Sequence, residues 1–187
     1  MHNVTFLKSV CTAVLLLGSA TALAVGPAQK AEKAPVATPP PPPSDADQVA
    51  GLQKMCADNG PAIGKRQLER SLFERLGKES KIQILAEKIL AAHSKNTKIG
   101  RLFVKVKKEA FVKNVTDFLV VGTGGKADYK GRDMASAHKD LKITSGDFLS
   151  AGGDVKQAMT EMGYGENEIQ EVVCALTSFV PVVVVQN

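Results

Sequence analysis

Apolar residues recur at steps of three and four along the second half of the chain and divide it into amphipathic segments. Three such stripes are Ile82, Leu85, Ala86, Ile89 and Leu90; Phe111, Val115, Phe118 and Leu119; and Ile169, Val172, Val173, Leu176 and Phe179. This spacing places apolar side chains on one face of an α-helix. Two helix starts fit the same scheme, because Ser71 precedes Glu74 and Thr144 precedes Asp147 by the three residues of a capping pattern. The pattern therefore predicts an all-α fold.

The first 24 residues have the pattern of an export signal. Lys8 is followed by an apolar run from Val10 to Leu17 and by small residues that end at Ala24, where we expect cleavage. An uncleaved anchor helix is the alternative, but the run is shorter than the roughly 20 residues that span a bilayer. We therefore expect an exported protein, periplasmic or extracellular, with no membrane span in the mature chain.

Composition divides the remainder into three parts. Residues 25–44 form a Pro-rich linker, since Pro35 and the run from Pro39 to Pro43 favour a stiff, extended spacer. Residues 45–70 form a polar N-terminal extension, expected to be irregular or partly helical with a turn at 59–61. Residues 71–187 have the size of one compact domain.

Charge and cysteine content narrow the classes of function. A net charge of +5 is too modest to require nucleic acid, and we expect no such partner. The lysines at 105, 107, 108 and 113 are most simply a solvated helix face, with an anionic partner as the alternative. No CxxC or CxxCH motif occurs, so neither an iron–sulfur cluster nor covalently attached haem is supported. Cys56 and Cys174 either form a disulfide or leave Cys174 as a buried thiol.

His138 is the strongest candidate for chemistry, because the mature chain would retain only two histidines. It follows a segment rich in glycine, with Gly122, Gly124, Gly125 and Gly131, which predicts an irregular connection rather than a long helix. Aromatic residues at helical spacing are by themselves more often core than cofactor site. Periodicity alone therefore does not justify a cofactor.

Several short motifs resemble the group 1 truncated haemoglobins over about residues 71–184. They are Ser-Leu-Phe-Glu-Arg-Leu-Gly (71–77), Gly-Arg-Leu-Phe (100–103), the run from Gly124 to Thr144, Glu-Met-Gly-Tyr-Gly (161–165) and the final amphipathic segment. The most specific part runs from Tyr129 to Ile143, where Met134, His138 and Ile143 match family positions. The resemblance implies a two-on-two helical sandwich around one b-type haem.

The resemblance also assigns roles to individual residues. It implies that His138 is the proximal iron ligand, a role suited to a neutral imidazole whose other nitrogen is fixed by an acceptor. It implies that Met134 packs under the porphyrin and that Phe103 stacks on the haem edge. Phe118 and Tyr129 match aromatic family positions, and Lys113 is expected to pair with a haem propionate.

The distal positions depart from the family pattern. Counted from Phe103 without a gap, Leu90 stands where many relatives have a tyrosine, and Phe111 and Val115 occupy the two positions on the next helix. None of these side chains can donate a hydrogen bond, so we expect an apolar distal pocket. A shift of one residue in this count would instead bring Asn114 over the iron.

Two further points concern the turn after the first helix and a possible sixth ligand of the iron. Relatives often have two glycines after the first helix, whereas here Gly77 is followed by Lys78, and we expect Gly77 alone to supply the positive φ angle. His93, Lys113 or Asn114 could in principle act as a sixth iron ligand. For His93 we expect a solvated position at a helix end.

Two classes of function remain open on these grounds. The first is a haem protein that binds oxygen, nitric oxide or carbon monoxide, with nitric oxide dioxygenation or other redox activity only if an electron donor exists, which the sequence does not identify. The second is a globin-shaped interaction module that has lost haem. The motif around His138 favours the first.

Overall fold

The computed structural model describes residues 40–185, which are entirely helical in their regular structure, with no strand in that range. The α-helices are α1 (Asp45–Glu69), α2 (Leu72–Arg75), α3 (Lys78–Lys95), α4 (Lys108–Gly122), α5 (Met134–His138), α6 (Ser145–Glu161), α7 (Glu166–Thr177) and α8 (Val180–Val183), with one 3₁₀ turn, η1 (Gly100–Leu102). The all-α prediction is thus confirmed. The expected signal peptide (1–24) and all but the last residues of the expected linker lie outside the described residues.

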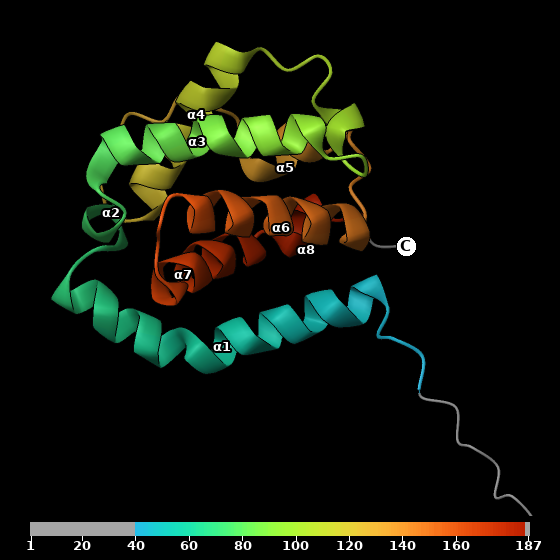
Figure 1. Ribbon diagram of the computed structural model, residues 1–187, viewed down its shortest axis with the longest axis horizontal. Helices are drawn as coiled ribbons and strands as arrows, with labels where there is room; N and C mark the ends of the chain where they lie inside the picture. The colour runs from blue at the N-terminus through green and yellow to red at the C-terminus, as the bar shows by residue number, and fades with distance from the viewer. Residues whose placement is uncertain (1–39, 186–187) are drawn as a thin grey trace, which may run out of the picture. The chain divides into compact units, whose positions relative to one another are not determined.

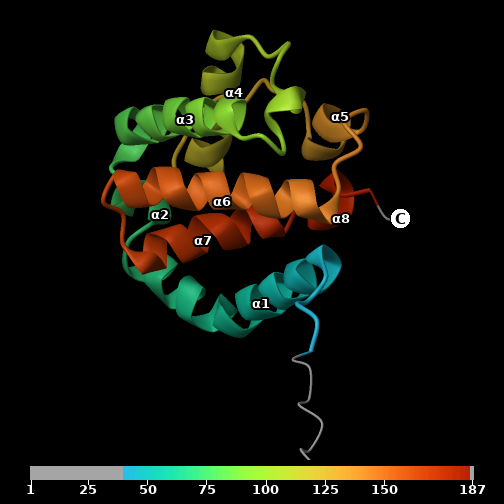
Figure 2. The same cartoon turned by 45° about the vertical axis from the view of Figure 1, so that its right-hand side comes forward.

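The helices are stacked in three layers (Figure 1). α3 and α4 pack against each other, and α3 also packs on α6, which lies beside α7. These four helices form the two-on-two arrangement, and α1 covers the opposite side of the α6 and α7 pair, as the turned view also shows (Figure 2). The short helix α5 stands at the edge of this sandwich, where it contacts α8.

The sequence stripes supply the core of the sandwich. One cluster joins α2, α3, α4, α6 and α7, and its fully buried members include Leu76, Ile82, Leu85, Met159 and Val172. A smaller cluster of Ala86, Leu90 and Val112 lies between α3 and α4. Burial of one such side chain contributes roughly 1.5–3 kcal/mol, so these two clusters supply much of the driving force that holds the α3 and α4 layer on the α6 and α7 layer.

The N-terminal extension was expected to be irregular or partly helical with a turn at 59–61, and it is helical without that turn. α1 is one helix that continues through Pro61, and it begins with a capping box between Ser44 and Asp47. Pro61 cannot donate to the carbonyl of Ala57. Ala57 is exposed, so water can satisfy that carbonyl, and the helix tolerates the proline at its surface.

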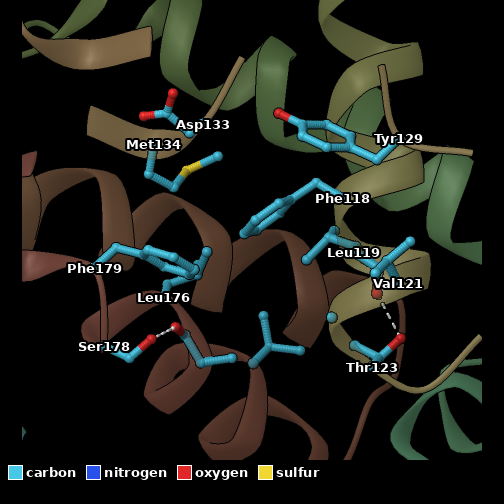
Figure 3. Close-up of a pocket in the computed structure, with 13 residues that line it drawn as sticks. Phe118, Leu119, Val121, Thr123, Tyr129, Asp133, Met134, Leu176, Ser178 and Phe179 are labelled. Carbon is cyan, nitrogen blue, oxygen red and sulfur yellow. Dashed lines mark hydrogen bonds between the residues drawn. The ribbon is translucent and has the colours of Figure 1, made fainter. Parts of the chain in front are cut away.

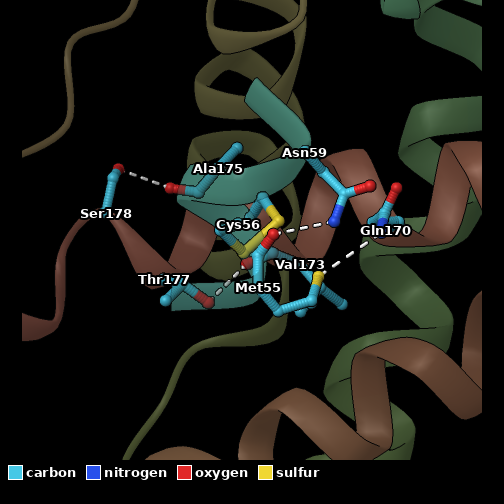
Figure 4. Close-up of a disulfide and its surroundings, with 9 residues drawn as sticks. Met55, Cys56, Asn59, Gln170, Val173, Ala175, Thr177 and Ser178 are labelled. Atoms are coloured by element: carbon cyan, nitrogen blue, oxygen red, sulfur yellow. Dashed lines mark hydrogen bonds between the residues drawn. A yellow bond between two sulfur atoms is a disulfide. The ribbon is translucent and has the colours of Figure 1, made fainter. Parts of the chain in front are cut away.

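Two contacts attach α1 to α7. Cys56 and Cys174 form a disulfide, which settles the alternative that the sequence left open (Figure 4). Further along α1, Arg66 and Gln67 donate to the carboxylate of Glu171, which also accepts from Arg75 of α2. The Glu171 side chain is only 1% exposed. The extension is therefore part of the folded domain.

The junction of α2 and α3 carries two consecutive left-handed residues. Gly77 has φ +84°, as expected, but Lys78 also has a positive φ of 64°. An L-residue other than glycine is strained in this region by roughly 1–2 kcal/mol. Lys78 is thus accommodated at a position that suits glycine.

Across residues 40–185, every helix is too short or too polar to cross a bilayer.

Candidate functional site

His138 ends the short helix α5, whose start is fixed by its own sequence. The Asp133 carboxylate accepts a hydrogen bond from the Ser136 backbone N–H at 2.8 Å, which caps the helix. One turn later, Nδ1 of His138 lies 2.8 Å from the carbonyl oxygen of Met134. A carbonyl only accepts, so Nδ1 must carry the proton and the lone pair of Nε2 remains available. In a neutral ring this arrangement leaves Nε2 able to coordinate a metal ion.

A cavity of about 450 Å³ lies beside the first residue of α5 (Figure 3). Its walls include Phe118 from α4, Tyr129 and Met134 from the α5 region, and Leu176 and Phe179 from the end of α7. The Phe118 ring lies 6.0 Å from that of Tyr129 and 5.5 Å from that of Phe179, measured between centroids. The volume is within the range of cofactor and small-molecule pockets, and the lining is mostly apolar.

Tyr129 is held in place at the rim of this cavity. Its hydroxyl donates to the carbonyl oxygen of Arg132 at 2.7 Å. Burial raises the pKa of Tyr129.

The residues expected on the distal side form a second group between α3 and α4. Leu90 is buried with Ala86 and Val112, and Phe103, Phe111 and Val115 pack against these residues. The rings of Phe103 and Phe111 meet edge to face with centroids 5.9 Å apart. Asn114, the alternative from a shifted count, is exposed.

One face of α4 connects the two groups. Phe111 and Val115 contact the distal cluster, and Phe118, one turn further along the same face, lines the cavity. Met134 and His138 stand one turn apart on α5, but only Met134 reaches the cavity wall. Lys113 lies on another side of α4, 68% exposed and 2.7 Å from the Asp117 carboxylate, whose hydrogen bond raises the pKa of Lys113. The Lys113 ammonium has three donors, so a propionate partner would share it with Asp117.

Most residues that line the cavity were not among the site residues assigned from the sequence, and Leu176 and Phe179 are among the largest of them. Leu176 and Phe179 belong to the last apolar stripe, which predicted packing in the core and gave no sign of a cavity. Phe179 lies just beyond α7, which ends at Thr177, and immediately before α8. Its side chain lines the cavity. The sequence signal that could have indicated Phe179 is that the last apolar stripe continues past the end of the helix.

The expectation of a solvated His93 is wrong. The residue is 6% exposed, and its Nδ1 lies 2.8 Å from Oδ2 of Asp154 on α6. Asp154 is 61 positions away in the sequence, so no local pattern reveals the pair. Burial lowers the pKa of His93, and the opposing effect of the Asp154 carboxylate is smaller.

These groups fit a haem better than a small polar ligand. An imidazole with a free Nε2, flat aromatic walls and an apolar cluster on the facing helix pair match what a porphyrin and its iron require. Together with the two-on-two helices, they define a globin of the truncated class. The chain belongs to the bacterial-like globin family, whose model matches residues 71–184. It is a group 1 truncated globin, and the family supports haem as the cofactor.

Individual relatives agree with this assignment. The chain is 27% identical over 105 residues to a group 1 truncated haemoglobin of Tetrahymena thermophila, covering 54% of this chain and 84% of the relative. It is 26% identical over 110 residues to one of Chlamydomonas moewusii, covering 58% of this chain but only 64% of that protein, less than two thirds of its length.

Solved structures show the same fold. The ferric truncated haemoglobin of Tetrahymena pyriformis superimposes with a TM-score of 0.60 at 20% identity, covering 63% of this chain and all of that one. The two-on-two haemoglobin of Synechococcus sp. PCC 7002, solved in the cyanomet state with covalently attached haem, gives 0.54 at 25% identity and covers 57% and 89% of the two chains. The resemblance inferred from the motifs is confirmed.

Proposed function

We propose that this protein binds a b-type haem through His138 and reversibly binds a diatomic gas at the iron. The observation that carries the proposal is the contact between Nδ1 of His138 and the Met134 carbonyl, because it leaves Nε2 free and fixes the ring plane. Ferrous haem supplies the affinity for oxygen, nitric oxide or carbon monoxide. The chain would supply the histidine that ligates the iron, the slot that holds the haem and the side chains around the bound gas.

The residues around the cavity suit a non-covalent haem. Met134, Phe118 and Tyr129 would contact the porphyrin, and Phe103 would meet its edge. Attachment through a CxxCH motif is excluded because the chain has none. In this proposal these contacts and the iron ligand carry the free energy of haem binding.

The proposed distal side is apolar. Leu90, Phe111 and Val115 cannot donate a hydrogen bond, and a donor to charged or partly charged oxygen contributes about 1.5–3 kcal/mol. We expect weaker retention of oxygen than in relatives with a tyrosine or glutamine there, and comparatively strong binding of carbon monoxide. Val115→Gln should slow oxygen dissociation by about tenfold or more. An oxygen dissociation rate in the wild type that already matches a donor-containing pocket would contradict this.

The cellular setting is also part of the proposal. Export is supported by the signal-like sequence of residues 1–24 and by the Cys56–Cys174 disulfide, which suits an oxidising compartment. N-terminal sequencing of the exported protein should begin at Val25, and a sequence that begins near Met1 would contradict cleavage. Nitric oxide dioxygenation would need an electron donor outside the cytoplasm.

The deciding experiment is the visible spectrum of the mature chain with added haem, in the ferric, ferrous and carbon monoxide forms. We expect stoichiometric uptake and a spectrum of histidine-ligated haem that is lost or displaced in His138→Ala. Lys139→Ala, on the exposed neighbour, is the matched control and should behave as the wild type. A wild type that takes up no haem would refute the proposal and leave a globin-shaped interaction module as the better account.

A further inference from the structure

A buried polar cluster lies where α3 ends against α6. Nδ1 of His93 is 2.8 Å from Oδ2 of Asp154, and Nδ2 of Asn96 donates to both carboxylate oxygens at 2.9 and 3.0 Å. Ser150 exchanges hydrogen bonds with the Asn96 side chain at 3.0 and 3.3 Å. The side chains of His93 and Asp154 are only 8% and 13% exposed.

Such a cluster costs free energy unless each group is paired, so its presence needs an explanation. The Asp154 carboxylate accepts from both His93 and Asn96, and the Nδ1 proton of His93 must point at Asp154. The imidazole is therefore held in one plane by α6. A charge-assisted hydrogen bond of this kind is stronger than a neutral one.

The ring of His93 contacts the aromatic residues of the distal cluster. Its ring lies against Phe103, with centroids 4.9 Å apart and planes inclined by 36°. Phe103 in turn meets Phe111 edge to face. The contacts thus run from α6 through His93 to Phe103, the ring that the proposed haem edge would meet.

We propose that His93 is a positioning residue for the haem pocket: held by Asp154, it fixes the Phe103 ring against the haem. The inference rests on the proposed function and adds a residue that contacts neither iron nor porphyrin. His93 acts through the ring contact on one side and the hydrogen bond on the other.

Three variants separate these two contacts. His93→Phe keeps a flat ring beside Phe103 and removes the donor to Asp154. His93→Asn keeps a short donor and removes the ring. Asp154→Asn keeps the volume but places an NH₂ group among donors and removes the charge. Tyr164→Phe is the control, because it removes one comparable hydrogen bond, to the Leu76 carbonyl at 2.7 Å, in the other core cluster.

The measurements are the rate of haem loss to an excess of apomyoglobin and the width and position of the infrared stretching band of bound carbon monoxide. We expect all three variants to lose haem about fivefold to tenfold faster and to broaden or shift the band, while Tyr164→Phe matches the wild type. If His93→Asn does not fold, the isosteric Asp154→Asn variant decides.

Three results would overturn the inference. Variants that are less stable to heat but keep the wild-type band and rate of haem loss would show a purely structural pair. A six-coordinate low-spin ferric spectrum that disappears in His93→Phe would make His93 an iron ligand instead. Failure of the wild type to bind haem would overturn the proposed function itself and this inference with it.

Discussion

Glu171 offers the sharpest test of how the N-terminal helix is held to the globin fold. Its buried carboxylate accepts from Arg66 of α1 and Arg75 of α2, and Gln67 adds a longer contact at 3.3 Å. Glu171→Gln keeps the size of the side chain but leaves two guanidinium groups facing one amide. Arg66 and Arg75 donate to different carboxylate oxygens, so in the variant one of them faces an NH₂ group, which is itself a donor.

The size of the effect follows from burial. The side chain of Arg75 is 8% exposed and that of Arg66 is 23% exposed, so water can reach only part of the second charge. Breaking a buried ion pair by removing one partner costs about 3–5 kcal/mol, and the partial exposure of Arg66 favours the lower end. For a domain of this size, about 3 kcal/mol corresponds to a fall in Tm of roughly 6–12 °C.

The assay is thermal unfolding followed by circular dichroism, with Glu168→Gln as the matched control. Glu168 is 21% exposed and, within residues 40–185, forms an ion pair with Arg75 alone, at 2.7 Å, so its change should cost about 1 kcal/mol. If both variants melted within about 2 °C of the wild type, the cluster would contribute nothing measurable and the argument from burial would be refuted.

Three other changes should alter stability in stated directions. Reduction by a dithiol should lower the free energy of unfolding by about 4 kcal/mol, because the Cys56–Cys174 bond joins residues 118 positions apart. Urea unfolding should show this loss. The stability of a chain with both cysteines changed to alanine should not depend on the reductant. Lys78→Gly should raise the free energy of unfolding by about 1 kcal/mol by relieving the positive φ angle, and an unchanged urea midpoint would count against strain there. Burial lowers the pKa of His93, so the unfolded chain binds more protons below pH 6.5 and stability should fall as the pH drops through that value. His93→Phe should remove this part of the slope, and an identical slope in both proteins would disprove it.

The sequence predicted the parts of the fold that depend on local periodicity. The stripe from Ile82 to Leu90 lies on α3, that from Phe111 to Leu119 on α4, and that from Ile169 to Leu176 on α7. These predictions succeed because a helix with one buried face has an apolar residue every three or four positions. The irregular segment before His138 was likewise foreseen from its glycines.

What the sequence did not predict depends on contacts between distant residues. His93 is flanked by small and charged residues typical of a solvated helix end, and only Asp154, on another helix, explains its burial. The Cys56–Cys174 disulfide forms because the fold brings α1 and α7 together, which no local sequence pattern indicates. The helix through Pro61 contradicts the local rule that proline stops a helix, which carries little weight where the freed carbonyl meets water.

The attachment of α1 also has a mechanical consequence. A pull on the chain ahead of Asp45 would load α1 first, and the covalent bond at Cys56 would pass that tension directly to Cys174 on α7. The load would therefore bypass α3 and α5, which carry His93 and His138. A pull on the N-terminal end would therefore reach the cavity beside Met134 through α7, whose Leu176 forms part of the cavity wall.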